Sequence, residues 1–356
     1  MLLVLSSLYG QTGGIPAFNR LLVRAAVEQA AGRPLCVVAL TDAADTTLPA
    51  EFVEKLEYVP CAGDRRRCAL ETARALARLR PLLLGHVNLA PLGLLGTPLG
   101  WPFGVIAHGT EVWSPLPWHR RLALRRAAVV ACVSDDTARR VQAVQGVLAG
   151  RTLRIINALD SLPPIVDEDA APKRPLRLLS VTRLHPGEPK GIDLVLRAIA
   201  GLPQLALQYT VIGDGAERPR LRALADGLGL GDRARFAGRL GDGERDRALA
   251  ECDLFVLPSS GEGFGIVFLE AMARGRACLG ARVGGTPEVV LDEKTGLLVE
   301  PTVEAVRAAL LRLQDPSLRT RLGQAGRARV AAHFTYENFR QRAFALFDAL
   351  AAQPPP

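Results

Sequence analysis

The chain is poor in the features that mark several common classes of protein. Only 5% of its 356 residues are aromatic, and its six cysteines show no pairs at metal-site spacing. No apolar run approaches the roughly 20 residues of a membrane-spanning helix. The opening segment MLLVLSSLYG lacks the basic residues that begin a secretory signal. These absences predict a cytoplasmic protein with buried free thiols and no membrane span.

Several motifs for metal and nucleotide chemistry are also missing. The sequence contains no G-x-x-x-x-G-K-[ST] phosphate loop and no G-x-S-x-G nucleophile turn. Its acidic cluster, Asp167–Asp169, lies in a proline-rich segment and not at the end of an apolar strand. We therefore expect no metal site, and a diphosphate would have to be neutralised by protein cations.

Positive charge exceeds negative charge by eight, but the excess is spread along the chain and does not indicate a nucleic-acid surface. One local concentration, between Val112 and Ser134, contains no acidic residue and has Trp113 and Trp118 nearby. Its four arginines are Arg120, Arg121, Arg125 and Arg126. Two interpretations stay open: a solvated helix face, or contact with anionic lipids at the inner membrane face, worth about 1 kcal/mol per arginine.

Short apolar runs alternate with helical patterns along nearly the whole chain, as in parallel sheets covered on both faces. In the first half, strands are predicted at 1–6, 35–40, 81–84, 105–107 and 128–133, and helices at 16–31, 65–79 and 135–144. In the second half, strands are predicted at 177–181, 208–212, 235–237 and 253–257, and helices at 191–200, 218–227, 243–252, 265–274, 303–313, 317–332 and 336–351.

The alternation stops at 158–175, where prolines and mixed charges predict an interdomain linker. We therefore predict an α/β protein of two doubly wound Rossmann-like domains that face a cleft. The first would span 1–165 and the second 166–335. In such folds, ligands bind at the carboxyl ends of the strands.

The segment 259–275, SSGEGFGIVFLEAMARG, joins a glycine-rich turn to a helix directly after an apolar strand. Glycines allow close backbone approach, and free N–H groups at a helix start favour anions. Glu262 lies in the turn and Glu270 in the second helical turn, so the two carboxylates could hold two polyol rings with a diphosphate between them. Taken alone, the segment is explained most simply as a glycine-rich helix cap.

Three further strand ends carry candidate residues. In SVTRLHPGEPKG, Arg183 and Lys190 offer two cations for a diphosphate, although a plain surface loop would look the same. The first strand is followed by GQTGGIPAF, which could receive phosphate but lacks G-x-G-x-x-G. His108 follows another strand, as His86 and His185 do, and a lone histidine is more often structural than functional.

Together these segments resemble glycosyltransferase family 4, whose members have the two-domain GT-B fold and retain anomeric configuration. The resemblance covers nearly the whole chain and is strongest over 178–301. The motifs that carry it, in the family's order, are SVTRL, KGIDLVLRA, YTVIGDGAERPRL, ARFAGRL, DLFVLPSSGEGFGIVFLEAMARG, GGTPEVV and TGLLVEP.

The resemblance implies a role for each candidate residue. Glu262 would orient the donor sugar and Glu270 would hold the ribose. Arg183 and Lys190 would stabilise the leaving diphosphate, while His108 would position the transferred sugar. The remaining donor-binding residues would be Gly13, Gly14, Leu240, Asp242, Gly263, Phe264, Gly265, Ile266 and Val267. The family is thought to need no protein nucleophile, since the leaving phosphate helps to deprotonate the acceptor.

The resemblance also implies that the C-terminal helix, 336–356, packs back on the first domain. Three departures from the family pattern occur: Asn157–Ala158 replaces an asparagine-glycine pair, Arg276 replaces the usual proline after AMARG, and the spacer before Lys190 is longer than usual. The spacer leaves the position of Lys190 less fixed than that of Arg183.

The expected activity is transfer of a hexosyl unit from a UDP- or GDP-sugar to a glycan or lipid-linked acceptor in bacterial polysaccharide, lipopolysaccharide or glycolipid synthesis. No cofactor is expected. Two alternatives remain: a sugar-nucleotide epimerase on the same fold, and a non-catalytic GT-B scaffold. The spacing of Glu262, Glu270 and Arg183 argues against the epimerase, and retention of the charged residues argues against the scaffold.

Overall fold

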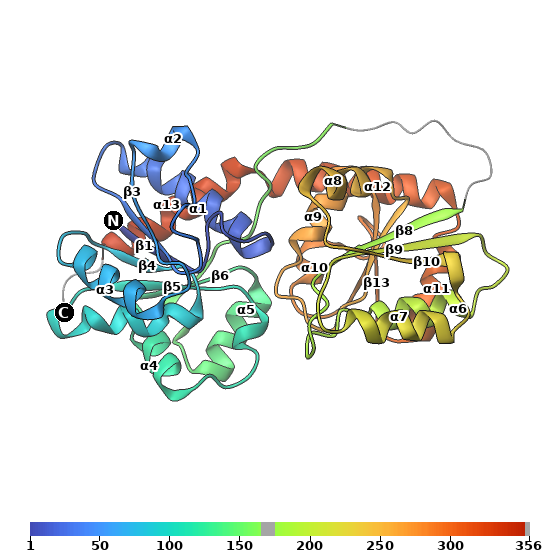
Figure 1. Ribbon diagram of the computed structural model, residues 1–356, viewed down its shortest axis with the longest axis horizontal. Helices are drawn as coiled ribbons and strands as arrows, with labels where there is room; N and C mark the ends of the chain where they lie inside the picture. Colours follow the sequence, from blue (N-terminus) through green and yellow to red (C-terminus); the bar gives the residue numbers. More distant parts are fainter. Residues whose placement is uncertain (165–174, 353–356) are drawn as a thin grey trace. The chain divides into compact units, whose positions relative to one another are not determined.

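A computed structural model describes residues 1–164 and 175–352. The chain divides into two compact units, unit 1 formed by Met1–Asp160 with Tyr336–Pro356, and unit 2 formed by Ser161–Thr335 (Figure 1). Most of the expected linker, together with Asp167–Asp169, lies outside the described residues.

Unit 1 is built on a seven-stranded parallel sheet in the order β3-β2-β1-β4-β5-β6-β7. The strands are β1 (Leu2–Leu5), β2 (Cys36–Ala39), β3 (Glu57–Pro60), β4 (Leu82–Leu84), β5 (Phe103–Ala107), β6 (Val129–Cys132) and β7 (Thr152–Arg154). The direction of winding reverses between β1 and β4. That position is the topological switch point, outside which such sheets bind ligands.

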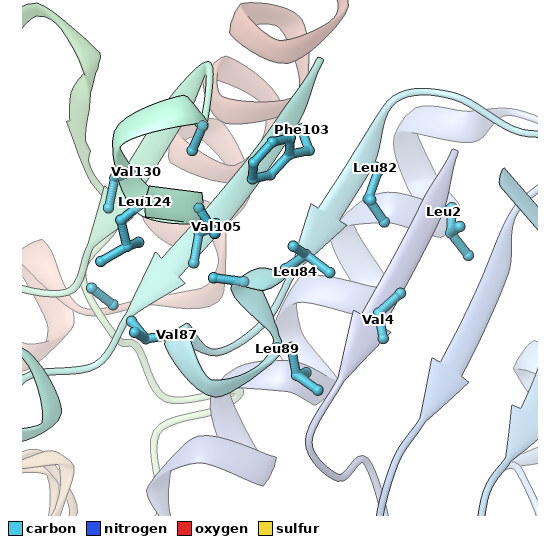
Figure 2. Packing of buried hydrophobic residues seen from close by; sticks show 14 of the residues in the cluster. Leu2, Val4, Leu82, Leu84, Val87, Leu89, Phe103, Val105, Leu124 and Val130 are labelled. Atoms are coloured by element: carbon cyan, nitrogen blue, oxygen red, sulfur yellow. The ribbon is translucent and has the colours of Figure 1, made fainter. Parts of the chain in front are cut away.

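The inner strands of unit 1 are buried on both faces because alternate side chains meet different helices, whereas the edge strands β3 and β7 are partly exposed. Figure 2 shows one face, where leucine, valine and phenylalanine side chains of β1, β4, β5 and β6 pack with the 3₁₀ helix η1 (Val87–Leu95) and α4 (Trp118–Arg126). On the other face, Leu350 of α13 (Tyr336–Ala351) reaches β5 at Gly104, whose missing side chain leaves room for it. α13 also packs against α1 (Gly14–Ala30). A fully buried leucine or valine contributes roughly 1.5–3 kcal/mol to such a core.

Two further helices of unit 1 start at polar caps. Asp64 accepts hydrogen bonds from two backbone N–H groups at the start of α3 (Arg65–Leu76), and Ser134 caps α5 (Asp135–Arg140). The short elements are α2 (Ala50–Val53), η2 (Thr97–Leu99), η3 (Thr110–Val112), the π-helical turn η4 (Val141–Gln145) and η5 (Ala149–Arg151).

Unit 2 contains a six-stranded parallel sheet in the order β10-β9-β8-β11-β12-β13, with its switch point between β8 and β11. The strands are β8 (Leu176–Val181), β9 (Leu207–Ile212), β10 (Ala234–Gly238), β11 (Leu254–Leu257), β12 (Ala277–Ala281) and β13 (Leu297–Val299). The helices are α6 (Ile192–Ala200), α7 (Arg218–Gly227), the 3₁₀ turn η6 (Gly231–Arg233), α8 (Asp242–Glu251), α9 (Ile266–Ala273), α10 (Thr286–Val289), α11 (Val303–Arg312) and α12 (Pro316–His333).

The prediction of two doubly wound Rossmann-like sheets is confirmed. Four strands were missed: β3, β7 and β13 are short edge strands, and β12 consists mostly of small residues with weak strand preference. Three helices differ from their predicted bounds by two residues or more. α1 begins at Gly14 and not at 16, α3 ends at Leu76 and not at 79, and the helix expected at 135–144 changes to a π-helical turn after Arg140.

All six cysteines are free and buried, as predicted. Within residues 1–164 and 175–352, none of the helices combines the length and the apolar character needed to cross a bilayer.

Candidate functional site

The switch point of unit 2 brings together the loops that follow β8 and β11. Pro189, in the β8 loop, accepts hydrogen bonds at its carbonyl oxygen from the Ser260 backbone N–H (3.1 Å) and the Ser259 hydroxyl (3.2 Å). Gly191 ends the first loop with φ +71°, and a Cβ there would collide with the Pro258 carbonyl. Only glycine satisfies both conditions, so the approach of the two loops depends on Gly191.

These linked loops place Lys190 against Glu262. The Lys190 ammonium lies 3.3 Å from Glu262 Oε2 and donates to the Gly261 carbonyl at 3.4 Å. Their side chains are only 13% and 18% exposed, so the pair is screened little by solvent. The structure therefore brings together two residues that the sequence placed on different motifs, even though Lys190 follows an unusually long spacer.

Glu188, which the sequence analysis did not single out, bridges the two cations. Its carboxylate lies 3.6 Å from Lys190 Nζ and 3.6 Å from a terminal nitrogen of Arg183. The Arg183 side chain is 78% exposed, and its contact with the cluster is the ion pair with Glu188. Glu188 could have been recognised in the sequence, because it is an acidic residue only two positions before Lys190 in the same loop.

The glycine-rich turn before α9 is held in place from behind. Gly265 caps the helix with φ +90°, and the Gly285 N–H donates to the Glu262 carbonyl at 2.9 Å. Gly263 and Phe264 are buried, while Ile266 and Val267 are half-buried in the first helical turn. First-turn N–H groups have no intrahelical acceptor, so they can donate to an anion bound at this turn.

Glu270, one turn further along α9, pairs with Arg245 of α8 at 3.2 Å. Burial raises the pKa of Glu270, against the opposing effect of Arg245 and Arg274. Leu240 is half-buried just before α8, and Asp242 is exposed as its first residue. The start of α8 therefore lies near Glu270, and Arg245 is a contact that the sequence did not reveal.

In unit 1, Gly13 and Gly14 follow a loop organised by a buried carboxylate. Gly13 caps α1 with φ +132°, and Gly14 is the first helical residue. Asp42, fully buried after β2, accepts hydrogen bonds from the Leu8, Tyr9 and Gly10 backbone N–H groups and from two hydroxyls, those of Ser7 and Tyr58. Asp42 was missed, although an acidic residue directly after an apolar strand is a recognisable signal.

His108 follows β5 at the same carboxyl edge. Its Nε2 lies 2.8 Å from the Gly85 carbonyl, which can only accept, so Nε2 carries the proton and Nδ1 keeps its lone pair. The ring packs edge-on against Phe18 (5.1 Å between centroids) and stacks on His86 (5.7 Å). Burial lowers the pKa of His108 to about 4, outweighing the nearby Glu111 carboxylate. His108 is therefore neutral at pH 7.

The four arginines on and around α4 differ in their surroundings. Arg121 and Arg125 each donate through Nε to the Gln145 carbonyl, at 3.3 and 2.9 Å. Arg126 is exposed and Arg120 half-buried, while Trp118 at the start of α4 is 77% exposed. Two of the four arginines thus have a structural contact, and they do not form one uniformly free basic face.

Comparison with known proteins identifies the family. Residues 164–329 match the family described as glycosyl transferases group 1. Over 291 residues the chain is 36% identical to the GDP-mannose-dependent alpha-(1-6)-phosphatidylinositol monomannoside mannosyltransferase of Mycolicibacterium smegmatis, covering 71% of each chain.

Solved structures agree on the fold. Sucrose-phosphate synthase from Thermosynechococcus elongatus matches with a TM-score of 0.80 at 23% identity, covering 99% of each chain. Anabaena HepE in complex with UDP and glucose matches with a TM-score of 0.78 at 20% identity, covering 98% of this chain and 99% of that one. The chain belongs to the glycosyl transferases group 1 family and is a glycosyltransferase with the GT-B fold.

Proposed function

We propose that this glycosyltransferase is a retaining hexosyltransferase that uses a nucleotide-diphosphate sugar and acts on a glycan or lipid-linked acceptor in bacterial polysaccharide, lipopolysaccharide or glycolipid synthesis. The observation that carries the proposal is the Lys190–Glu262 pair at the switch point of unit 2, where a doubly wound sheet binds its ligand. The mycobacterial relative is named for GDP-mannose, which makes GDP-mannose the first donor to test.

Different residues of unit 2 would bind different parts of the donor. Lys190 and Arg183 would neutralise the diphosphate in place of a metal ion, with the glycine-rich turn donating backbone N–H groups to it. Glu262, turned toward Lys190, would accept hydroxyl hydrogen bonds from the sugar. Glu270 would accept those of the ribose, and Leu240 and Asp242 would lie beside the nucleobase.

The transfer step then needs no protein nucleophile. The bond between the sugar C1 and the diphosphate oxygen breaks while the acceptor oxygen bonds to C1 on the same face, and the acceptor proton passes to the departing phosphate. In unit 1, neutral His108 would position the sugar through its backbone and ring, and Gly13 and Gly14 would leave room for phosphate or acceptor.

Donor choice and metal independence can be tested by thermal unfolding with GDP-mannose, UDP-glucose or ADP-glucose in the presence of EDTA. A ligand at one hundred times its Kd stabilises the folded state by about 2.7 kcal/mol, which raises the Tm of the binding unit by roughly 5–10 °C. We expect GDP-mannose to give this shift. If none of the three shifts the Tm with or without Mg²⁺, the donor site is not in this chain.

The role of Glu262 can be separated from binding with Glu262→Gln. This variant should bind GDP at least as tightly as the wild type does, and transfer should fall at least a hundredfold because the sugar is no longer oriented. Nuclear magnetic resonance of the wild-type product should show the α-anomer from α-linked GDP-mannose. A β-linked product would overturn the retaining mechanism, and unchanged turnover would remove Glu262 from the site.

We further propose that the protein lies in the cytoplasm, peripherally on the inner face of the membrane, with α4 toward anionic lipid. Trp118 and Arg126, at the two ends of α4, are both exposed, which supports this placement. Flotation with phosphatidylglycerol vesicles should weaken about fivefold for Arg126→Ser and further when Arg120, Arg121 and Arg125 are also changed. Equal flotation of all variants, or equal binding to neutral phosphatidylcholine vesicles, would refute the membrane contact.

A further inference from the structure

Arg245 connects α8 to the carboxylate of Glu270 on α9. The distance between its terminal nitrogen and Glu270 Oε1 is 3.2 Å, and the two side chains are 27% and 15% exposed. Arg245 also lies 3.5 Å from Asp246, its neighbour on α8. It is therefore a partly buried arginine whose position is set by two carboxylates.

The two oxygens of the Glu270 carboxylate are used differently. Oε1 pairs with Arg245, whereas Oε2 is buried without a hydrogen-bond partner among the described residues. Arg274 does not fill that role, since it donates to the Glu270 backbone carbonyl at 2.9 Å and pairs with Asp246 at 3.1 Å. A buried acceptor without a donor is unfavourable in the free protein, and it is satisfied when a ligand brings hydroxyl groups to it.

The charge of Glu270 depends on the same arginine. Burial raises its pKa, Arg245 and Arg274 oppose that rise, and Asp246 and Asp242 add to it. An ionised carboxylate accepts hydrogen bonds more strongly than a neutral one. Removal of Arg245 would therefore both release Oε1 and favour protonation of the group.

We propose that Arg245 is a positioning residue for the nucleoside ribose, which holds Glu270 by one oxygen and leaves the other, ionised and fixed in direction, for the ribose hydroxyls. The inference rests on the proposed function, in which the donor is a nucleoside-diphosphate sugar. It adds to that function a residue outside the glycine-rich motif, on the helix that begins at Asp242.

The experiment compares GDP and UDP with their 2′,3′-dideoxy forms, which lack the ribose hydroxyls. Titration calorimetry would measure the Kd of each for the full-length wild type, Arg245→Met, Arg245→Lys and Arg247→Met between pH 5 and 8. Arg247 is exposed on the same helix and provides the matched control. Thermal unfolding of each variant shows whether it is folded.

Arg245→Met should weaken GDP or UDP binding about tenfold. Because protonation of Glu270 becomes easier, the affinity of this variant should begin to fall about one pH unit higher than that of the wild type. Binding of the dideoxy form should be the same as in wild type, because it makes no use of Glu270. Arg245→Lys should restore part of the affinity, and Arg247→Met should change nothing.

Equal weakening of the ribose and dideoxy nucleotides by Arg245→Met would overturn the positioning role, as it would show a general disturbance of unit 2. An unchanged pH profile would overturn it as well. If the wild type binds neither GDP nor UDP, the proposed function itself fails, and this outcome is distinct because it appears before any variant is made.

Discussion

At the residue scale, the cluster around Lys190 contains two cations and two carboxylates, so its formal charges cancel. Glu188 contributes one of those carboxylates and touches both cations at 3.6 Å. A diphosphate that binds Arg183 and Lys190 must displace or tolerate it. Under the proposed function, Glu188 would therefore compete with the donor for the two cations.

Glu188→Gln should strengthen binding of GDP and of inorganic pyrophosphate by about two- to fivefold. Partly exposed ion pairs are worth roughly 0.2–1 kcal/mol, and this attraction would become available to the ligand. Calorimetric titration at low and high salt would measure it, and the gain should shrink as salt rises. Glu251→Gln, an equal charge change at an exposed position of α8, should leave the Kd unaltered; an equal gain there would attribute the effect to net charge.

Asp42 yields a prediction about stability and pH. Burial favours its protonation, but hydrogen bonds from Ser7, Tyr58 and the loop backbone outweigh burial and hold its pKa below the ordinary value of 3.8. Asp42→Asn would turn an amide N–H toward backbone donors and should cost about 3 kcal/mol or more at pH 7.

Because the folded pKa of Asp42 is lowered, its stabilisation is complete above the unfolded pKa and disappears as pH falls through the folded pKa. The difference between wild type and Asp42→Asn in urea unfolding should therefore shrink between pH 5 and pH 3. Asp45→Asn, exposed in the same loop, should match the wild type throughout. A difference that stays constant with pH would show that the Asp42 charge is not the cause.

The sequence could indicate site residues that belong to one local motif, but not a residue whose contact depends on the packing of two helices. Glu262, Glu270 and Lys190 belong to local motifs with glycines and strand ends beside them, so they could be proposed as site residues without coordinates. Arg245 could not be found in that way, since its partner Glu270 lies on the next helix. The contact exists because α8 and α9 pack together, and a spacing pattern within one helix does not contain that information.

At the element scale, two glycines have similar backbone angles but different surroundings. Comparing alanine substitutions at the two positions distinguishes the cost of backbone strain from the cost of a steric clash. Gly191 has φ +71° and would place a Cβ against the Pro258 carbonyl, whereas Gly229 has φ +65° and open space around it. Gly229→Ala should cost about 1 kcal/mol for the left-handed backbone alone.

Gly191→Ala should cost at least about 2 kcal/mol and also weaken GDP binding, since the loop that carries Lys190 must move away from β11. The readouts are Tm and the GDP Kd for both variants. Loss of binding in Gly229→Ala, or retention of it in Gly191→Ala, would contradict the assignment of the linked loops to the donor site.

Helices and central strands were predictable because burial imposes a regular pattern on their residues. α7 and α13 have the predicted boundaries, and β8, β9 and β11 differ by one residue. The π-helical turn at Val141–Gln145 was not predictable, because distant contacts of the buried Gln145 side chain hold it in place. The Gln145 side chain donates to the Val112 and Ser114 carbonyls and accepts from the Leu116 N–H. These partners lie about thirty residues away in the chain.

At the scale of the whole molecule, the chain passes between the two units twice, after Asp160 and before Tyr336. Arg24 of α1 contacts a residue beside each passage. Its guanidinium lies 2.5 Å from Asp160 and 3.7 Å from the centre of the Tyr336 ring. Glu28, one turn along, accepts from the Tyr336 hydroxyl at 2.8 Å. Both connections are therefore attached to the same face of α1.

Arg24→Met should loosen both attachments together. The ion pair is worth up to about 1 kcal/mol and the cation–π contact about 0.5–1 kcal/mol, so amide exchange at 156–160 and 337–343 should accelerate about five- to thirtyfold. Exchange at 262–268, within unit 2, should stay as in wild type because Glu28, Asp160 and Tyr336, which Arg24 contacts, all belong to unit 1. Lys55→Met, an equal charge change on the surface of unit 1, controls for net charge. If only one of the two segments exchanges faster, Arg24 holds that connection alone, and the joint attachment is refuted.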